Sequence, residues 1–205
     1  LDGFELRTAA TAAAGEQLVL HGQPPPEIVF CELDLPDKSG LDVHAFIARS
    51  ESFTQVFDGT TRFMRPRLTD RSFLQEFDPL DTHQKGFIEG NAWNYSLYVP
   101  HEPVELADLM GGKKRFGEHL DSLFTTRLDD KYFEKTEDIT RDGIMGNYVH
   151  GNEPSHHVAF LYNYSDRPWM TGKRTRDVMD LMYRPTPDGL SGNDDCGQMS
   201  AWYIF

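Results

Sequence analysis

Three short runs of this chain each place an acidic residue beside glycine and asparagine, directly ahead of a segment rich in aromatic residues. The runs are residues 89–93, 151–157 and 192–202. Glycine lets a loop turn tightly and approach a ligand closely, and an acid at the mouth of a helix lies near its positive end. A single run of this kind is usually a solvated turn or a helix cap. Three of them favour a repeated loop-then-helix unit, with the loops converging on one pocket.

Apolar residues elsewhere recur mainly at helical spacing. The pattern predicts helices over residues 41–57, 91–99, 104–110, 113–124, 154–164, 171–183 and 198–205. It also predicts a short strand over residues 27–33 and loops over 60–70 and 131–145. Loops longer than about 12 residues in a compact domain tend to be functional. The expected fold class is therefore mainly α with long functional loops. Antiparallel helices wound into a toroid, with the loops gathered at one end, would satisfy this pattern.

Composition narrows the classes of function. A chain of 205 residues is one domain by default and is long enough to bury a core. With 20 Lys and Arg against 33 Asp and Glu, the net charge is −13. That charge disfavours nucleic acids and anionic membranes as partners, and it suits cation binding or a neutral substrate. No run approaches the ~18 apolar residues of a membrane span. The start at Leu1, without an initiator Met or a basic leader, is typical of a mature, trimmed or partial chain.

The two cysteines, Cys31 and Cys196, are too few for a disulfide scaffold and form no CxxC zinc pattern. One disulfide and two free thiols are both open. His156 and His157 are adjacent and point about 100° apart on a helix, so one zinc site would rarely use both. A role at the start of a helix or in contact with a sugar is the stronger interpretation for these histidines.

Glu89 and Asp195 have the contrast that glycoside hydrolysis requires, one protonated and one ionised carboxyl group. Glu89 follows Phe87 and Ile88, and apolar neighbours raise a carboxyl pKa by desolvation, so it is the better general acid. Asp195 lies among Gly and Asn residues and is the better general base. In the second run Asn152 and Glu153 offer the hard oxygen ligands that calcium prefers.

Taken together, the motifs resemble those of the glycoside hydrolase family 92 α-mannosidases, in the family's order and over about residues 45–205. The runs that carry the resemblance are Phe-Met-Arg-Pro-Arg at 63–67, Glu-Gly-Asn-Ala-Trp-Asn-Tyr at 89–95, Val-Pro-His at 99–101, Gly-Asn-Glu-Pro-Ser-His-His at 151–157, Tyr-Asn-Tyr at 162–164, Pro-Trp at 168–169 and Gly-Asn-Asp-Asp-Cys-Gly-Gln-Met-Ser-Ala-Trp-Tyr at 192–203.

The resemblance implies an (α/α)6 toroid behind an N-terminal β-sandwich domain. It also implies calcium-dependent, inverting exo-hydrolysis of α-mannosides by a secreted or periplasmic enzyme. Position in the motifs makes Glu89 the general acid and Asp195 the general base, while Asn193 stands where many members have a second acid that supports the base. The implied calcium neighbourhood is Asn152, Glu153 and Asp195, and the ion would contact the mannose hydroxyls and help to distort the ring.

By the same resemblance, several further residues are expected to contact the sugar. They are Trp93, His150, Glu153, His156 and Asp194. Trp93 has a commoner alternative, which is burial in the core. His150 matches a contact to the leaving group. Gly151 follows it where members specific for α-1,2 linkages tend to have Glu, so the linkage stays open.

The domain expectation is a divergent segment over residues 1–44 followed by a portion of the (α/α)6 catalytic domain over 45–205. The expected partner is a mannose-containing oligosaccharide or a glycoprotein glycan, as in N-glycan processing, and a β-sandwich domain or further toroid residues would complete the pocket. Two alternatives remain open. One is a non-catalytic calcium- and mannose-binding remnant or inactive fragment, and the other is a structural remnant whose acidic loops are solvated caps.

Overall fold

A computed structural model of the chain describes residues 50–82, 86–87, 89–132 and 143–205. The chain divides into two units, Leu1–Glu51 and Ser52–Phe205. Everything that follows concerns the second unit. The strand expected over residues 27–33, Cys31 and the whole 1–44 segment lie outside the described residues, and so do residues 41–49 of the expected 41–57 helix.

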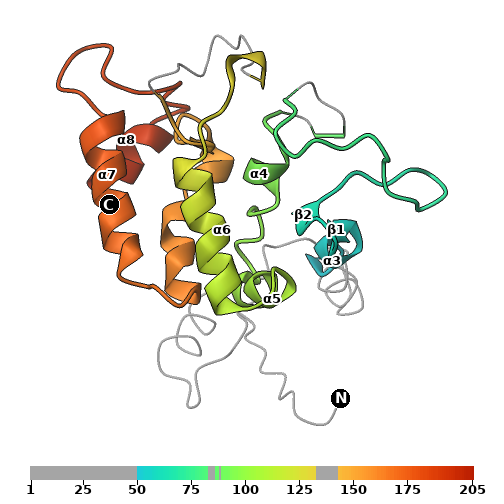
Figure 1. The fold of residues 1–205 in the computed structure, drawn as a ribbon. Coiled ribbons are helices and arrows are strands. Elements are labelled where there is room, and N and C mark those ends of the chain that lie inside the picture. Colours follow the sequence, from blue (N-terminus) through green and yellow to red (C-terminus); the bar gives the residue numbers. More distant parts are fainter. Residues whose placement is uncertain (1–49, 83–85, 88, 133–142) are drawn as a thin grey trace, which may run out of the picture. The chain divides into compact units, whose positions relative to one another are not determined.

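The second unit is built mainly from helices, with two short β-hairpins (Figure 1). In chain order its elements are α3 (Phe53–Val56), β1 (Phe57–Asp58), β2 (Phe63–Met64), α4 (Ala92–Tyr95), α5 (Pro103–Leu109), α6 (Lys113–Thr125), the 3₁₀ turn η1 (Asp130–Tyr132), β3 (Ile144–Met145), β4 (Tyr148–Val149), the 3₁₀ segments η3 (Glu153–Ser155) and η4 (Val158–Tyr164), α7 (Met170–Met182) and α8 (Gln198–Ile204). Strand β1 pairs antiparallel with β2, and β3 pairs antiparallel with β4.

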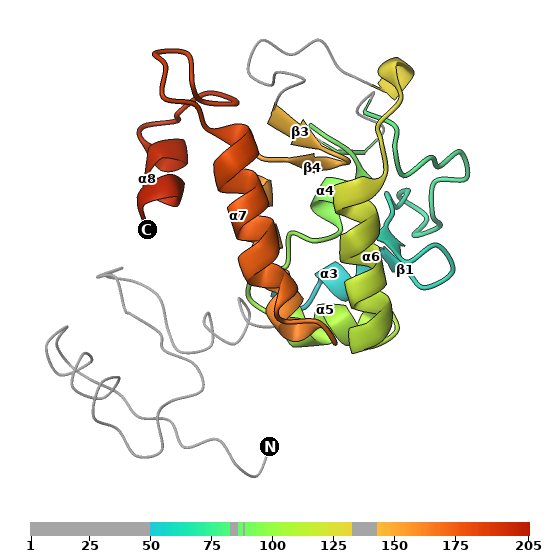
Figure 2. The same cartoon turned by 60° about the vertical axis from the view of Figure 1, so that its left-hand side comes forward.

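Segment η4 is the centre of the packing, because it contacts α5, α6 and α7. Figures 1 and 2 show the two long helices, α6 and α7, and Figure 2 shows β3 and β4 between their upper ends. The core between these elements is fully buried and largely aromatic or aliphatic. Its largest members are Tyr148, Tyr162, Phe116, Leu97, Leu106, Met110, Leu120 and Leu123. Asp121 links α6 to η4 and to the segment before α7. It accepts a hydrogen bond from Tyr162 of η4 (2.8 Å) and forms an ion pair with Arg167 (2.5 Å).

The strongly periodic helices form where the sequence predicts them. Helix α6 buries Phe116, Leu120, Leu123 and Phe124 on one face, as the spacing of these residues requires. Helices α5, α7 and α8 begin and end within one residue of the predicted bounds. The described residues are therefore helix-rich. Their helices do not by themselves close a ring, so the (α/α)6 toroid stays a prediction.

The single helix predicted over residues 154–164 is wrong, because the structure has two 3₁₀ segments there. In an α-helix the carbonyl of His156 would accept from the amide of Phe160. It accepts instead from Trp202 Nε1 at 2.9 Å, and the amide of Phe160 bonds the carbonyl of His157. In a 3₁₀ helix the side chains of residues i and i+3 lie above one another, so the side chains form three rows. In η4 one row includes Val158 and Leu161 and a second includes Ala159 and Tyr162, and these four residues are buried.

Four other predicted elements also differ from the structure. The 91–99 helix ends at Tyr95, because later polar groups bond elsewhere: Ser96 Oγ accepts from the amide of Met64 (2.7 Å), and the carbonyl of Leu97 accepts from His157 (2.8 Å). Residues 57–58 form a strand rather than the end of a helix, and the 60–70 loop contains its partner strand β2. The 131–145 loop overlaps η1 and contains β3, and residues 133–142 within it lie outside the described part of the chain.

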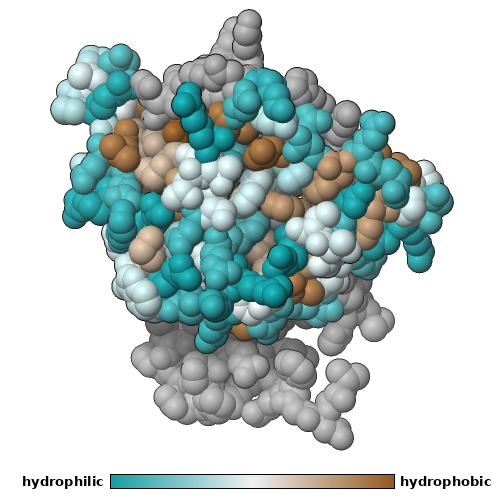
Figure 3. Space-filling view, viewed as in Figure 1, coloured by the Kyte–Doolittle hydropathy of each residue, from teal (hydrophilic) through white to brown (hydrophobic). Residues whose placement is uncertain are grey.

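The surface of the described residues is mainly polar. Figure 3 shows a mostly hydrophilic face with separate hydrophobic patches. Among the described residues, no helix is both long and apolar enough to cross a membrane.

Candidate active site

Two glycines bring the second and third acidic runs into backbone contact. A Cβ atom placed on Gly151 would lie 2.5 Å from the carbonyl oxygen of Ser191, and one placed on Gly192 would lie 2.6 Å from Gly151 Cα. Real Cβ atoms do not approach other atoms this closely, so both positions require glycine. The loop after β4 and the loop before α8 can therefore touch, and the acids that follow each glycine come together.

Glu153 and Asp195 form the acidic pair that results. Their carboxyl groups share a hydrogen bond, and this bond is the main reason that the pKa of Glu153 is raised. Partial burial and the negative charges of Asp195 and Glu89 raise the pKa of Glu153 further. The third predicted acid, Glu89, thus lies close enough to act electrostatically on this pair, although it comes from a separate loop.

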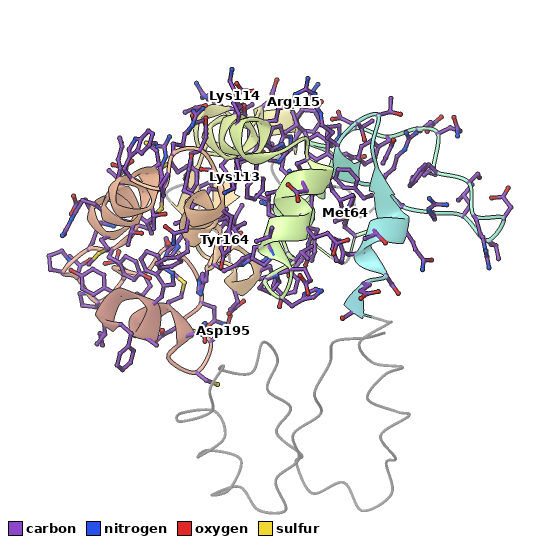
Figure 4. All side chains as sticks on the ribbon, turned by 90° about the horizontal axis from the view of Figure 1, so that it is seen from below. Met64, Lys113, Lys114, Arg115, Tyr164 and Asp195 are labelled. Atoms are coloured by element: carbon purple, nitrogen blue, oxygen red, sulfur yellow. The ribbon has the colours of Figure 1, made fainter. Side chains whose placement is uncertain are left out.

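Asp195 projects from a strained turn (Figure 4). The φ angles of Asp195, Cys196 and Gly197 are 44°, 59° and 93°, all in the left-handed region, which non-glycine residues rarely adopt. The side chain of Asn193 supports the turn, because its Oδ1 accepts from the amide of Asp195 at 3.2 Å. Left-handed residues of this kind concentrate at functional sites, where the surrounding structure holds them in place. Cys196, exposed in the same turn, is a free thiol.

Asp194 points the other way and anchors α8. Its two carboxylate oxygens accept from the amide and the hydroxyl of Ser200, at 2.9 and 3.0 Å. Its carbonyl also accepts from the amides of Gly197 and Met199. Both carboxylate oxygens of Asp194 therefore have partners within the protein, and its structural role is to fix the turn that presents Asp195.

Glu89 is exposed and lies just before α4. The described residues around it do not bury its carboxyl group, so the apolar surroundings expected from the sequence are not provided by this part of the chain. Its contact is polar instead: the hydroxyl of Tyr95 donates to Glu89 Oε1 at 2.9 Å. The ring of Tyr95 in turn stacks on Phe87, with the centroids 5.8 Å apart and an interplanar angle of 25°.

His150 is fully buried between two tyrosines. Its Nδ1 lies 2.8 Å from the hydroxyl of Tyr148, and its Nε2 lies 2.7 Å from the hydroxyl of Tyr183. Tyr183 donates its proton to the carbonyl of Met199, so we assign the ring proton of His150 to Nε2. Burial lowers the pKa of His150 to about 3, so the ring is neutral. Both ring nitrogens are used within the protein, and the sugar contact expected at His150 has no free nitrogen in this arrangement.

The adjacent histidines, His156 and His157, also bond to backbone. Nε2 of His156 donates to the carbonyl of His150 at 3.0 Å, and Nε2 of His157 donates to the carbonyl of Leu97 at 2.8 Å. Burial lowers the pKa of each ring. The two rings serve different carbonyls, which favours the structural role considered from the sequence over zinc binding.

Trp93 packs within an aromatic cluster on α4. Its ring stacks on His119, with the centroids 4.6 Å apart, and lies edge-on to Phe63 at 4.9 Å. Trp93 is half-buried and also contacts the main core. Trp93 therefore packs against the core, as its commoner alternative expects, and part of its side chain remains exposed.

The oxygen donors proposed for calcium are suitable in kind. Two carboxyl groups that share a hydrogen bond repel each other when both are ionised, and a divalent cation would remove that repulsion. Asn152, at the start of η3, adds an amide oxygen next to Glu153 in the chain. Calcium takes six to eight oxygen ligands, so water or sugar oxygens would complete the set. In the part of the chain that the structure describes, no three His, Cys, Asp or Glu side chains meet as a metal cluster.

The basic residues at the start of α6 do not offset this acidic charge. In the view of Figure 4, Lys114 and Arg115 lie at the edge opposite Asp195, and Lys113 lies between that edge and Asp195. The loop that carries Asp195 therefore keeps a negative character, which favours a cation.

Sequence reasoning missed the tyrosines and the tryptophan that hold the loops. Tyr148 bonds His150, the residue just before the second run. Tyr183 donates to the carbonyl of Met199 in α8, and Trp202 donates to the carbonyl of His156 in the second run. In the sequence Tyr148 and Tyr183 are indistinguishable from ordinary core residues. Tyr95, in contrast, belongs to the same run as Glu89, and its position within that motif is the one signal that could have suggested the contact.

Comparison with known proteins places the chain among glycosidases. A family model described as "Glycosyl hydrolase family 92 catalytic domain" matches residues 35–205. A family GH92 α-mannosidase from Bacteroides thetaiotaomicron, whose structure is also known with mannoimidazole bound, is 42% identical. The match covers 80% of this chain, with TM-scores of 0.68 for the enzyme alone and 0.71 for the complex. A family GH92 inverting mannosidase from the same bacterium is 31% identical over 79% of the chain, with a TM-score of 0.63.

A curated relative with lower sequence identity is also described as a glycosidase. An uncharacterized secreted glycosidase from the fungus Arthroderma benhamiae is 29% identical over 151 residues, or 74% of this chain. The chain spans about a fifth of the length of these relatives: 17% of the fungal protein, and 21% or 22% of the solved bacterial chains.

Proposed function

The chain belongs to glycosyl hydrolase family 92, and from this premise we propose that it carries catalytic residues of a calcium-dependent, inverting exo-α-mannosidase. One observation above all supports the proposal: Glu153 and Asp195 pair through a shared hydrogen bond while the charge of Glu89 acts on the same pair. Three acids from three separate runs, 42 or more residues apart, are thereby electrostatically linked. A purely structural arrangement gives no reason to gather like charges, because each raises the energy of the others.

In the proposed reaction, the carboxylate of Asp195 accepts a proton from water as the water oxygen attacks the anomeric carbon of the terminal mannose. Glu89 gives its proton to the glycosidic oxygen, which leaves with the electron pair of the broken bond. Asn193 holds the amide of Asp195 at 3.2 Å and thereby fixes the base in its turn. Inversion requires the two carboxyl groups to be about 6.5–9.5 Å apart, so that the water fits between them.

The proposed calcium neighbourhood is Asn152, Glu153 and Asp195. When bound, the ion would supply Lewis-acid and template chemistry toward the mannose hydroxyls. The protein's own part is to keep these oxygens together, and the contact between Gly151 and Gly192 does this through the backbone. Glu153 must give up its share of the proton before it can serve as an anionic ligand, so binding of the cation competes with protons.

The remaining expected sugar contacts divide into two kinds. Glu153 belongs to the acidic pair, and Trp93 keeps part of its ring exposed on α4. His150, His156 and Asp194 bond within the protein, so we propose that they act on the sugar indirectly, by orienting the two loops. The substrate would be the terminal α-linked mannose of an oligosaccharide or glycoprotein glycan. Further toroid residues and a β-sandwich domain would complete the pocket.

A secreted or periplasmic location is part of the same proposal. The printed name of the fungal relative describes it as secreted. A glycosidase that acts on the glycans of other proteins or cells meets its substrate outside the cytoplasm.

The test is release of mannose from α-mannobiosides by this chain, first with calcium and then with a chelator. We expect release that depends on calcium and is lost in Glu89→Gln and Asp195→Asn. The matched controls are Glu105→Gln and Asp108→Asn on α5, which remove exposed acids of the same types away from the site. Calcium and mannose binding without release would instead identify a non-catalytic binding module. No binding and no release would contradict the proposal.

The leaving group separates the roles of the two acids. Glu89→Gln should lose more activity on a mannoside with a poor leaving group than on one with a good leaving group, because a stable leaving group needs little protonation. Asp195→Asn should lose activity on both, since activation of the water is required in each case. Equal losses for Glu89→Gln on the two substrates would remove its assignment as the acid.

A further inference from the structure

The hydroxyl of Tyr95 contacts the proposed general acid. It donates to Glu89 Oε1 at 2.9 Å, and its ring is held by stacking on Phe87. The short helix that carries Tyr95 is itself fixed, because the side chains of Asn91 and Asn94 each accept from the other's backbone amide at 3.3 and 3.2 Å. The donor is therefore anchored at both ends, while the carboxyl group of Glu89 is exposed and would otherwise rotate freely.

We propose that Tyr95 is a positioning residue for Glu89, holding Oε1 in a hydrogen bond so that the catalytic proton is carried and delivered by Oε2. The inference rests on the proposed function, since it assigns a partner to the acid named there. It adds a residue whose side chain does not need to touch the sugar.

The chemistry explains why a donor at Oε1 assists the reaction. As the glycosidic bond breaks, its electron pair moves to the leaving oxygen, which takes the proton from Oε2. Glu89 then becomes a carboxylate, and its negative charge is shared with Oε1. A hydrogen bond to a charged oxygen is about twice as strong as one to a neutral oxygen. The bond from Tyr95 therefore strengthens as the proton leaves, which stabilises the transition state more than the ground state.

Tyr95 is suited to remain a donor. Burial, followed by the hydrogen bond to Glu89 and the charge of that residue, raises the pKa of its hydroxyl well above the usual value. The groups that act on the pair electrostatically are Tyr98, which affects Tyr95, and Glu153, whose own pKa is raised by Glu89. Neither of these residues donates to Oε1 in place of Tyr95, so removal of the Tyr95 hydroxyl takes away the hydrogen bond to Oε1.

The first experiment measures the ionisation of Glu89 directly, without requiring turnover. In chain labelled with ¹³C at the glutamate side-chain carboxyl, the Glu89 resonance is assigned with Glu89→Gln and titrated in wild type and Tyr95→Phe. We expect the pKa of Glu89 to rise by about one unit in Tyr95→Phe, because a hydrogen bond to the ionised form is lost. Tyr164→Phe is the matched control, since Tyr164 is an exposed tyrosine at the end of η4. It should leave the Glu89 resonance unchanged.

A second variant covers the case in which Tyr95→Phe does not fold. Phe87→Leu keeps the hydroxyl but removes the ring that stacks on Tyr95. A loosened Tyr95 should raise the pKa of Glu89 by a smaller amount than removal of the hydroxyl. An unchanged titration of Glu89 in either folded variant would overturn the proposal.

Kinetics then test the positioning role in protein that releases mannose. Tyr95→Phe should lower kcat by about ten- to a hundredfold on a poor leaving group, with little change in KM, and by less on a good leaving group. A loss that is equal for both leaving groups, or that falls on KM alone, would overturn the role in proton delivery. If the wild-type chain releases no mannose while Tyr95→Phe still shifts Glu89, the hydrogen bond stands and the proposed function fails, so the two failures are distinguishable.

Discussion

Acid should destabilise this fold strongly through His119, and the structure gives a magnitude. The ring lies between Trp93 and Phe63, and its Nε2 is buried without a hydrogen-bond partner in the structure. Burial, with a smaller contribution from the charge of Arg62, lowers the pKa of His119 from 6.5 to about 4. A protonated ring would place a charge against two aromatic rings with no acceptor for its proton.

The sign follows from the depressed pKa. Above the unfolded value of 6.5, both the folded and the unfolded states hold a neutral ring, and the stability is fully present. As the pH falls below 6.5 the unfolded chain takes up a proton that the folded chain refuses, so stability is lost until the pH reaches about 4. The difference of 2.5 units corresponds to about 3 kcal/mol in total, of which about 2 kcal/mol is already lost at pH 5.

The assay is urea denaturation of wild type and His119→Phe between pH 7.5 and 5. Phenylalanine keeps the stacking on Trp93 but does not titrate. We expect the variant to lose about 2 kcal/mol less than wild type over this range. His150, whose pKa burial lowers to about 3, leaves a residual acid sensitivity in both proteins. His101→Gln removes an exposed histidine as the control. If His119→Phe loses as much stability as wild type, the burial argument for His119 is refuted.

Two further predictions concern the acidic loops. Gly151→Ala should destabilise the fold by about 1–3 kcal/mol, because the added methyl group would be overpacked against the neighbouring loop. The control Gly172→Ala, at an open position in a helix, should stabilise the fold by up to about 1 kcal/mol. If the melting temperatures of the two variants move in the same direction, the close approach at Gly151 is contradicted. Glu153→Gln should raise the melting temperature in chelator at pH 7, because a carboxyl with a raised folded pKa loses stability as the pH rises through that value. The same variant should lose the rise in melting temperature that calcium gives to wild type, and a calcium response as large as that of wild type would remove Glu153 from the calcium neighbourhood.

How far the sequence predicts this fold depends on whether an element is specified locally. Helices α6 and α7 are predictable because their buried residues recur at helical spacing within the element itself. Segment η4 is not, because its geometry depends on the indole of Trp202, 46 residues away, taking the carbonyl of His156. The hairpin of β1 and β2 has strands of two residues each, too short for an alternating pattern to appear.

The candidate site shows the same division. The acids of the second and third runs are visible in the sequence, and so are the glycines beside them. What the sequence does not reveal is that Gly151 faces Gly192, since the contact joins loops from distant positions. Nor does it separate Asp194 from Asp195, two neighbouring residues of the same type. Their different directions follow from the left-handed backbone at Asp195 and from the position of Ser200 in α8.

The 3₁₀ geometry of η4 restricts how this part of the chain can change in length. Because a 3₁₀ helix has three residues per turn, one inserted or deleted residue rotates everything after it by about 120°. In η4 such a change would exchange a buried row for the exposed position of Phe160. Related chains should therefore keep the number of residues between His157 and Ser165 constant, and differences in length should collect in the surrounding loops, where no such rows have to be kept in phase.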